Sequence, residues 1–119
     1  MNSCEIRKSN IHGRGVFAKR DIRKGEKLCL YDGQIMDIGT PGDNSYDLGI
    51  PDTKTMCRGY REPRNSIGLG QFINDGARYV WTGVPEVDAI ALVIYLRQSS
   101  QIMNCKPVFH HKMIYMEAI

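Results

Sequence analysis

Short apolar runs separated by glycines dominate the hydrophobic pattern of this chain. Twelve glycines punctuate 119 residues. The runs between them have strand length and contain β-branched or aromatic residues, a composition typical of strands. They are "GVFA" (15–18), "KLCLY" (27–31), "QIMDI" (34–38), "YDLGI" (46–50), "PVF" (107–109) and "MIYM" (113–116). The pattern therefore predicts many short strands joined by tight connections.

Two clusters of turn-forming residues support this interpretation. "TPGDNS", residues 40–45, contains the residues that usually interrupt regular structure. "YDG", residues 31–33, lies between two of the predicted strands, and Asp-Gly favours a hairpin. We therefore expect a turn at each position and a hairpin at the second.

One segment, residues 84–101, has a different pattern. Pro85 suits a first helical turn, Glu86 and Asp88 favour the amino end of a helix, and Arg97 favours its carboxyl end. Five apolar residues fall on one helical face: Val87, Ile90, Ala91, Ile94 and Tyr95. The pattern predicts a helix here, although "AIALVIYL" within the segment also suits a buried strand.

The overall composition indicates one ordinary globular domain. Hydrophobic residues make up 42% and charged residues 24%, and no internal repeat or linker interrupts the 119 residues. No apolar run is long enough for a transmembrane helix, and the first residues lack the apolar region of a signal peptide. We therefore expect an intracellular protein, nuclear or cytoplasmic. The four cysteines form no Cys-x-x-Cys pair, which favours reduced thiols without a metal.

Charge is distributed unevenly along the chain. Residues 1–30 hold eight Lys or Arg against three Asp or Glu, a net charge of +5, whereas residues 31–119 hold eight against ten. A basic segment attracts nucleic acid or acidic peptides, or it is only a solvated face that keeps a protein soluble. Because no aromatic residues are interleaved for base stacking, we favour the solvated face and expect no direct nucleic-acid readout.

Two glycine-containing segments carry candidate chemistry. Gly13-Arg14-Gly15 allows a tight turn whose backbone N–H groups form a polar cradle. It lacks the third glycine of a dinucleotide fingerprint, so by itself it indicates only a turn. "GLGQFINDGA", residues 68–77, includes Asn74, whose amide both donates and accepts. That segment alone is also explained by a turn whose Asn and Asp cap their own backbone.

Taken together and in order, these segments resemble a known family. "GRGVFAKRDIRKGEKLCLYDG" is similar to the opening of a SET domain, the fold of many protein-lysine methyltransferases. "GLGQFINDGA" resembles the second SET motif, and "NCKPVFHHKMIYMEAI", residues 104–119, resembles the pair of strands that follows. The resemblance implies one mainly β domain over residues 1–119, with minor α. It would be a SET-like β-clip of several small sheets, with one short helix in an insertion at about 78–103.

The resemblance also implies a cofactor, S-adenosylmethionine. It assigns the cofactor contacts to six residues: His12, Gly13, Arg14, Gly15, Asn74 and Asp75. Asn74 would bind the methionine portion, and Asp75, which replaces the usual histidine, would lie near the adenine. Phe17 and Ala18 would begin the core strand behind the cofactor.

Tyr31 is the remaining candidate site residue. The resemblance places it near the channel that takes the substrate lysine, where its phenol would pack along the alkyl stem or orient the amine. A core aromatic with a hydrogen-bonded tip is the open alternative. A neutral lysine amine attacks the methyl group on a sulfonium, so the enzyme aligns the two and excludes water, and no metal is needed. The expected partner is a protein with a target lysine, such as a histone tail.

The carboxyl end departs from the family pattern. SET domains continue beyond "MIYMEAI" with a Gly-Glu-Glu segment and a tyrosine commonly essential for transfer, whereas the sequence stops at Ile119. We therefore expect a SET domain truncated at its carboxyl end, without the catalytic tyrosine and with weak or absent turnover. Two alternatives stay open: a non-catalytic SET-like protein-interaction module, and another β-rich clip-like fold without a cofactor.

Overall fold

The structure, a computed structural model, describes most of the chain. The described residues are 1–9, 13–51, 53–74, 101–102, 105–110 and 113–119. Their elements are β1 (Cys4–Lys8), β2 (Arg14–Ala18), β3 (Lys27–Leu30), β4 (Gly33–Asp37), β5 (Asp47–Gly49), β6 (Thr55–Gly59), the 3-10 turn η1 (Gly70–Phe72), β7 (Cys105–His110) and β8 (Met113–Ala118). All six predicted apolar runs contribute to strands. The expected helix at 84–101 lies outside the described residues, apart from Gln101.

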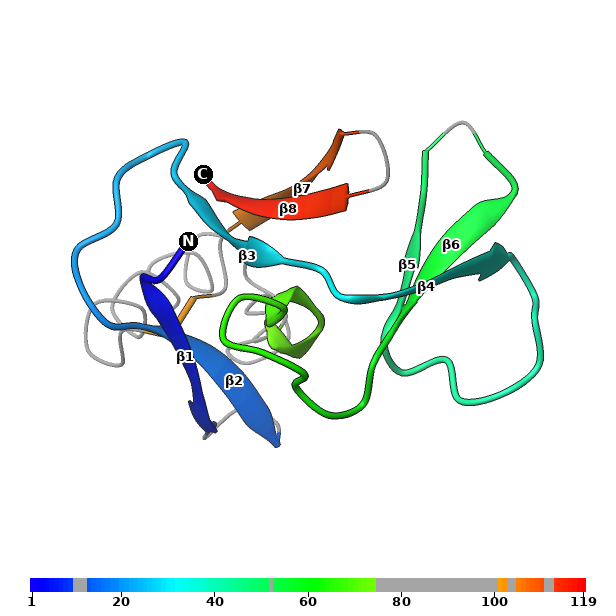
Figure 1. Cartoon of the computed structure of the whole chain (residues 1–119), viewed down its shortest axis with the longest axis horizontal. Coiled ribbons are helices and arrows are strands. Elements are labelled where there is room, and N and C mark those ends of the chain that lie inside the picture. Colours follow the sequence, from blue (N-terminus) through cyan, green and yellow to red (C-terminus); the bar gives the residue numbers. More distant parts are fainter. Residues whose placement is uncertain (10–12, 52, 75–100, 103–104, 111–112) are drawn as a thin grey trace, which may run out of the picture.

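The strands form three small antiparallel sheets, as expected for a β-rich SET-like fold. Their strand orders are β1-β2, β3-β8-β7 and β4-β6-β5. Figure 1 shows the three sheets as separate groups around η1, with β4, β5 and β6 at one end of the molecule. Within the described residues no sheet exceeds three strands, so each needs neighbouring elements to cover its apolar face.

The β1–β2 hairpin carries the first glycine-containing segment at its closed end, next to the connection between the two strands. The register runs from Cys4 opposite Ala18 to Lys8 opposite Arg14, and the Ser9 N–H extends it by donating to the Gly13 carbonyl at 2.8 Å. Val16 is fully buried on β2. The hairpin therefore fixes the position of residues 13–15 relative to the core.

The sheet β3-β8-β7 alternates between a buried face and a solvent face. Ile114 and Met116 on β8 are buried, whereas Met113 is exposed, as the period of two for a strand requires. On the outer face, the Lys27 ammonium lies 4.5 Å from the centre of the Tyr115 ring. This alternation matches the pattern of "MIYM" and explains why that run was recognisable as a strand.

The hairpin predicted at "YDG" is wrong. β3 ends at Leu30 and pairs with β8 at Tyr115, while β4 begins at Gly33 and pairs with β6. The Tyr31 N–H donates to the Ile114 carbonyl at 2.8 Å, so the chain still follows β8 where a turn was expected. Residues 31–33 therefore cross from one sheet to the next, because long-range pairing with β8 overrides the local turn preference.

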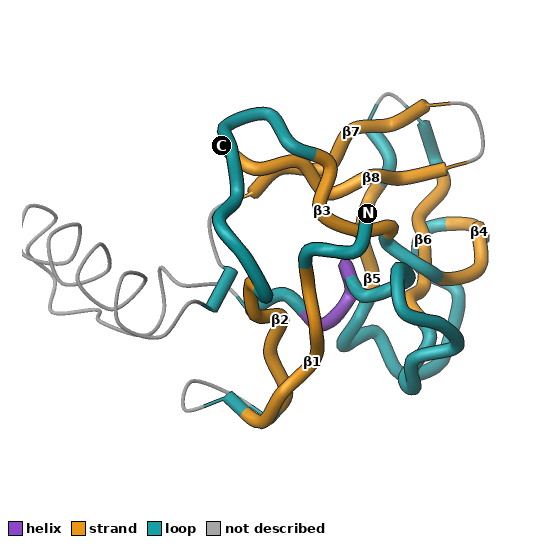
Figure 2. The backbone as a smooth tube through the Cα atoms, turned by 60° about the vertical axis from the view of Figure 1, so that its left-hand side comes forward, coloured by secondary structure: helices purple, strands orange, loops and turns teal. Residues whose placement is uncertain are grey.

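The core lies where the β1–β2 hairpin and the sheet β3-β8-β7 meet η1. Its buried residues are Cys4, Val16, Leu28, Cys29, Leu69, Phe72, Ile102 and Met116. Figure 2 shows η1 between the β1–β2 hairpin and the other strands. This placement makes the turn before Asn74 part of the core.

All four cysteines are free, with Cys4, Cys29 and Cys57 buried and Cys105 half-buried.

Across the described part of the chain, no helix has the length and apolar character needed to cross a membrane.

Candidate functional site

The structure brings the two glycine-containing segments together. Asn74 follows η1, and its Nδ2 donates to the Arg14 carbonyl at 3.1 Å, although 60 residues separate them in the chain. Phe72, the last residue of the three-residue turn η1, is buried in the core. Asn74 is therefore held in place by the element that precedes it. The candidate site is therefore a contact between Arg14, the first residue of β2, and Asn74 in the second segment. The turn predicted at Gly13-Arg14-Gly15 is found only at Gly13, because Arg14 and Gly15 pair with β1 as part of β2.

A buried glutamine that sequence reasoning missed completes this contact. Gln101 Oε1 accepts hydrogen bonds from Asn74 Nδ2 at 2.9 Å and from Ser9 Oγ at 2.8 Å. Gln101 itself is only 2% exposed. Its backbone bridges to Phe17, and the next residue, Ile102, donates its N–H to the Val16 carbonyl at 2.8 Å. Three segments of the chain thus converge on one amide oxygen.

The two glycines of residues 13–15 serve different purposes. Gly13 has a φ of +47°, a conformation that L side chains rarely adopt, and an added Cβ there would meet nothing within 4 Å. At Gly15, by contrast, an added Cβ would lie 2.3 Å from Gln101 Oε1 and 3.1 Å from Asn74 Nδ2. Gly13 is required for the turn and leaves one side of it open, whereas Gly15 makes room for the two amides.

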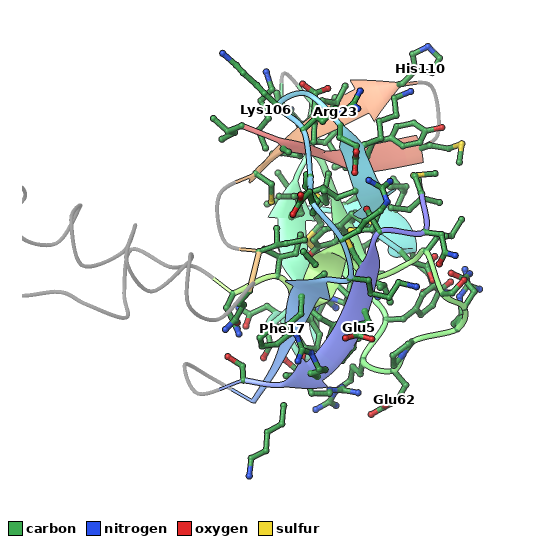
Figure 3. The ribbon with its side chains drawn as sticks, turned by 90° about the vertical axis from the view of Figure 1, so that its left-hand side faces the viewer. Glu5, Phe17, Arg23, Glu62, Lys106 and His110 are labelled. Atoms are coloured by element: carbon green, nitrogen blue, oxygen red, sulfur yellow. The ribbon has the colours of Figure 1, made fainter. Side chains whose placement is uncertain are left out.

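The Arg14 side chain is held on the side of η1. Its guanidinium carbon lies 4.7 Å from the centre of the Phe72 ring, Nη1 pairs with Glu62 at 2.9 Å, and Nη2 donates to the Arg61 carbonyl at 2.7 Å. The hydrogen bond to Glu62 raises the pKa of Arg14. Figure 3 shows Glu62 beside the end of the β1–β2 hairpin, which bears Glu5 and Phe17. These contacts tie the turn to the loop before η1.

Aromatic contacts connect this turn to Tyr31. The Phe72 ring packs edge-on against Tyr46, with centroids 5.4 Å apart. The Tyr31 hydroxyl donates to the Tyr46 carbonyl, and the ring packs against the core. Burial raises the pKa of Tyr31, so its phenol stays protonated and able to donate. A continuous set of contacts thus joins the predicted cofactor turn to the predicted lysine-channel tyrosine.

The remaining predicted residues can be placed only in part. His12 and Asp75 lie outside the described residues, as does Asn104. Gly13, Arg14, Gly15 and Asn74 lie together, and Tyr31 lies beyond the Phe72 and Tyr46 rings. Their roles in binding a cofactor or a lysine stay predictions.

The described residues suit a polar organic ligand. No described residue lies within 4 Å of a Cβ added at Gly13, so a ligand can approach the backbone there, while the Gly13 and Arg14 carbonyls already accept from the Ser9 N–H and Asn74 Nδ2. No group of three or more His, Cys, Asp or Glu side chains gathers within the described ranges to hold a metal.

Comparison with known proteins gives one partial similarity. The chain is 44% identical over 36 residues to a variant-silencing SET domain-containing protein of Plasmodium falciparum (isolate 3D7). That stretch is 30% of this chain, and it spans about 1% of the length of the Plasmodium protein. No protein-family model matches. The similarity supports a relation to SET-domain proteins over that stretch.

Proposed function

We propose that this chain is a SET-type module that binds S-adenosylmethionine and takes part in transferring its methyl group to a lysine of a protein substrate. The observation that carries the proposal is the hydrogen bond from Asn74 Nδ2 to the Arg14 carbonyl. It joins the two segments whose sequences resemble the two SET motifs. The partial similarity to a SET domain-containing protein agrees with it.

The residues present fit this cofactor. Gly13 leaves open space beside a polar backbone turn, and Asn74 holds its amide against that turn. We assign cofactor contacts to Gly13, Arg14, Gly15 and Asn74, together with His12 and Asp75 from the sequence. When bound, S-adenosylmethionine supplies a methyl group on a positively charged sulfur.

Tyr31 is assigned to the path of the substrate lysine. Its hydroxyl is engaged by the Tyr46 carbonyl, so its contribution is a fixed ring along which an alkyl stem can pack. The target is a lysine of another protein, with a histone tail as one candidate. The protein's own residues then have to orient the neutral amine and keep water away from it.

Ligand titration tests the proposal directly. We expect S-adenosylhomocysteine, the demethylated product, to bind the chain in isothermal titration calorimetry and to raise its Tm. Asn74→Ala removes the amide that joins the two segments, and it should weaken binding about tenfold.

Asn65→Ala is the matched control. Asn65 Oδ1 accepts from two local N–H groups, those of Ile67 at 3.1 Å and Gly68 at 2.7 Å. Its loss should leave the affinity within about twofold of the wild type, since the two hydrogen bonds removed are local and lie outside the site. Absence of both heat and thermal shift with the unsubstituted chain would rule out the cofactor site.

A further inference from the structure

Gln101 is a buried polar residue whose side-chain oxygen contacts two segments at the candidate site. Its Oε1 has two lone pairs, and Asn74 Nδ2 and Ser9 Oγ donate to it at 2.9 and 2.8 Å. The same oxygen occupies the space that a side chain at Gly15 would fill. One atom therefore bonds to the residue after β1 and to Asn74, two residues after η1, and it lies beside Gly15 on β2.

Its burial makes this arrangement rigid. At 2% exposure, Gln101 cannot exchange these bonds for water without opening the core. Its backbone is fixed as well, by the bridge to Phe17 and by the bond from Ile102 to Val16. The backbone of Gln101 and the two hydrogen bonds to its Oε1 thus hold the side chain in place.

This arrangement fixes which way the Asn74 amide faces. Nδ2 donates to two acceptors, the Arg14 carbonyl and Gln101 Oε1. A flipped amide would place Oδ1 against these two oxygens and lose both bonds. The orientation of Asn74, and through it the backbone position of Arg14, depends on Gln101.

We propose that Gln101 is the positioning residue of the candidate site, setting the orientation of the Asn74 amide and the position of residues 13–15 without touching the ligand. Its effect on cofactor affinity rests on the proposed function; its effect on Asn74 does not. Neither the hydrophobic pattern nor the SET resemblance assigned it a role.

The experiment compares Gln101→Met with Gln71→Met in the full chain. Both glutamines are buried, at 2% and 5% exposure, and methionine has a similar shape without the amide. Gln71 accepts from the Asp32 N–H and donates to the Tyr60 carbonyl, so it bridges other loops. Two quantities are measured: the NMR signals of the Asn74 side-chain amide, and the dissociation constant of S-adenosylhomocysteine.

Gln101→Met should move the Asn74 amide signals toward their values in an unfolded chain and weaken ligand binding about tenfold. Gln71→Met should change neither beyond the effect of its altered stability. Gln101→Glu retains an oxygen in the same place and should restore both the signals and the affinity to near wild type, although its carboxylate lowers stability.

The outcomes separate the two proposals. Unchanged Asn74 signals in Gln101→Met overturn the positioning role, as does unchanged affinity where the wild type binds. If the wild type binds no ligand, the proposed function fails, and the Asn74 signals alone decide the role of Gln101. If Gln101→Met does not fold, Ser9→Ala decides, because it removes one donor to Gln101: shifted Asn74 signals support the proposal and unshifted ones contradict it.

Discussion

At the residue scale, the two glycines of residues 13–15 predict different responses to the same substitution. Gly13→Ala adds a methyl group in open space and costs only the strain of positive φ, about 1 kcal/mol in free energy of unfolding. Gly15→Ala forces Gln101 from its place and breaks its bonds to Asn74 and Ser9, which should cost about 3 kcal/mol. Urea denaturation of both variants measures the difference.

A double substitution shows whether the steric cause is correct. In Gln101→Ala, the side chain that blocks Gly15 is absent, so adding Gly15→Ala should cost much less than it does in the wild type. Gly13→Ala should cost the same in both backgrounds, because Gly13 has no neighbour within 4 Å of the added methyl. Strict additivity at Gly15 would contradict the steric explanation.

The same residues show what the sequence alone could predict about the site. Gly13, Gly15 and Asn74 were recognisable because each belongs to a motif with a characteristic spacing. Gln101 was not, because a buried glutamine and a surface glutamine look alike in a sequence. It follows "RQSS", and the pattern placed it at the polar end of a helix. Only the fold shows that it pairs with β2.

At the element scale, the strands that the pattern missed have a common physical property. β1 and β6 contain no long apolar run: "CEIRK" alternates apolar and polar residues, and "TMCRG" has two adjacent apolar residues. A search for apolar runs finds strands that are apolar on both faces and overlooks amphipathic ones. The alternation of Cys4 and Ile6 with Glu5 and Arg7 was the available signal for β1.

The sheet β4-β6-β5 carries its own prediction. Arg58 on β6 forms a bidentate pair with Asp47 on β5, at 2.9 and 3.0 Å, and it donates to the carbonyls of Thr40 and Pro41 at 2.8 Å. The pair lowers the pKa of Asp47, chiefly through the Arg58 hydrogen bond. The Arg58 side chain thus holds the loop between β4 and β5 against the sheet through hydrogen bonds.

Arg58→Lys should release that loop, because an ammonium cannot donate in the planar fork geometry that reaches all three partners. Hydrogen exchange should become faster for the amides of residues 40–47, which mass spectrometry can measure. The amides of the β1–β2 hairpin and the affinity for S-adenosylhomocysteine should stay unchanged, since the Arg58 hydrogen bonds go to Asp47, Pro41 and Thr40 in another sheet and its loop. Equal exchange in both proteins would show that the loop is held by other contacts.

At the scale of the whole molecule, each of the three sheets contributes a buried cysteine to the packing. Cys4 lies on β1, Cys29 on β3 and Cys57 on β6, with exposures of 4%, 0% and 2%. Burial raises the pKa of Cys57 to about 11 and raises those of Cys4 and Cys29 as well. The thiols therefore report on the packing of all three sheets at once.

The sign of the resulting pH dependence follows from the order of ionisation. In the unfolded chain a thiol loses its proton near pH 9, whereas folded Cys57 retains it until about pH 11. Between these values the folded state binds more protons, so stability is fully present below about pH 9 and falls as pH rises toward 11. For Cys57 the slope is about 1 kcal/mol per pH unit.

Urea denaturation under reducing conditions from pH 7 to pH 10 measures this dependence. Tyrosines and lysines titrate in the same range, so the informative quantity is the difference between the wild type and Cys57→Val, in which a side chain of similar size cannot ionise. The variant should lose stability less steeply above pH 9, whatever its stability at pH 7. Parallel curves would mean that solvent reaches Cys57 in the folded state and that β6 is less tightly covered than its 2% exposure indicates. Cys57 lies on β6, the strand between β4 and β5. That result would therefore also contradict the close packing of the sheet that contains Arg58.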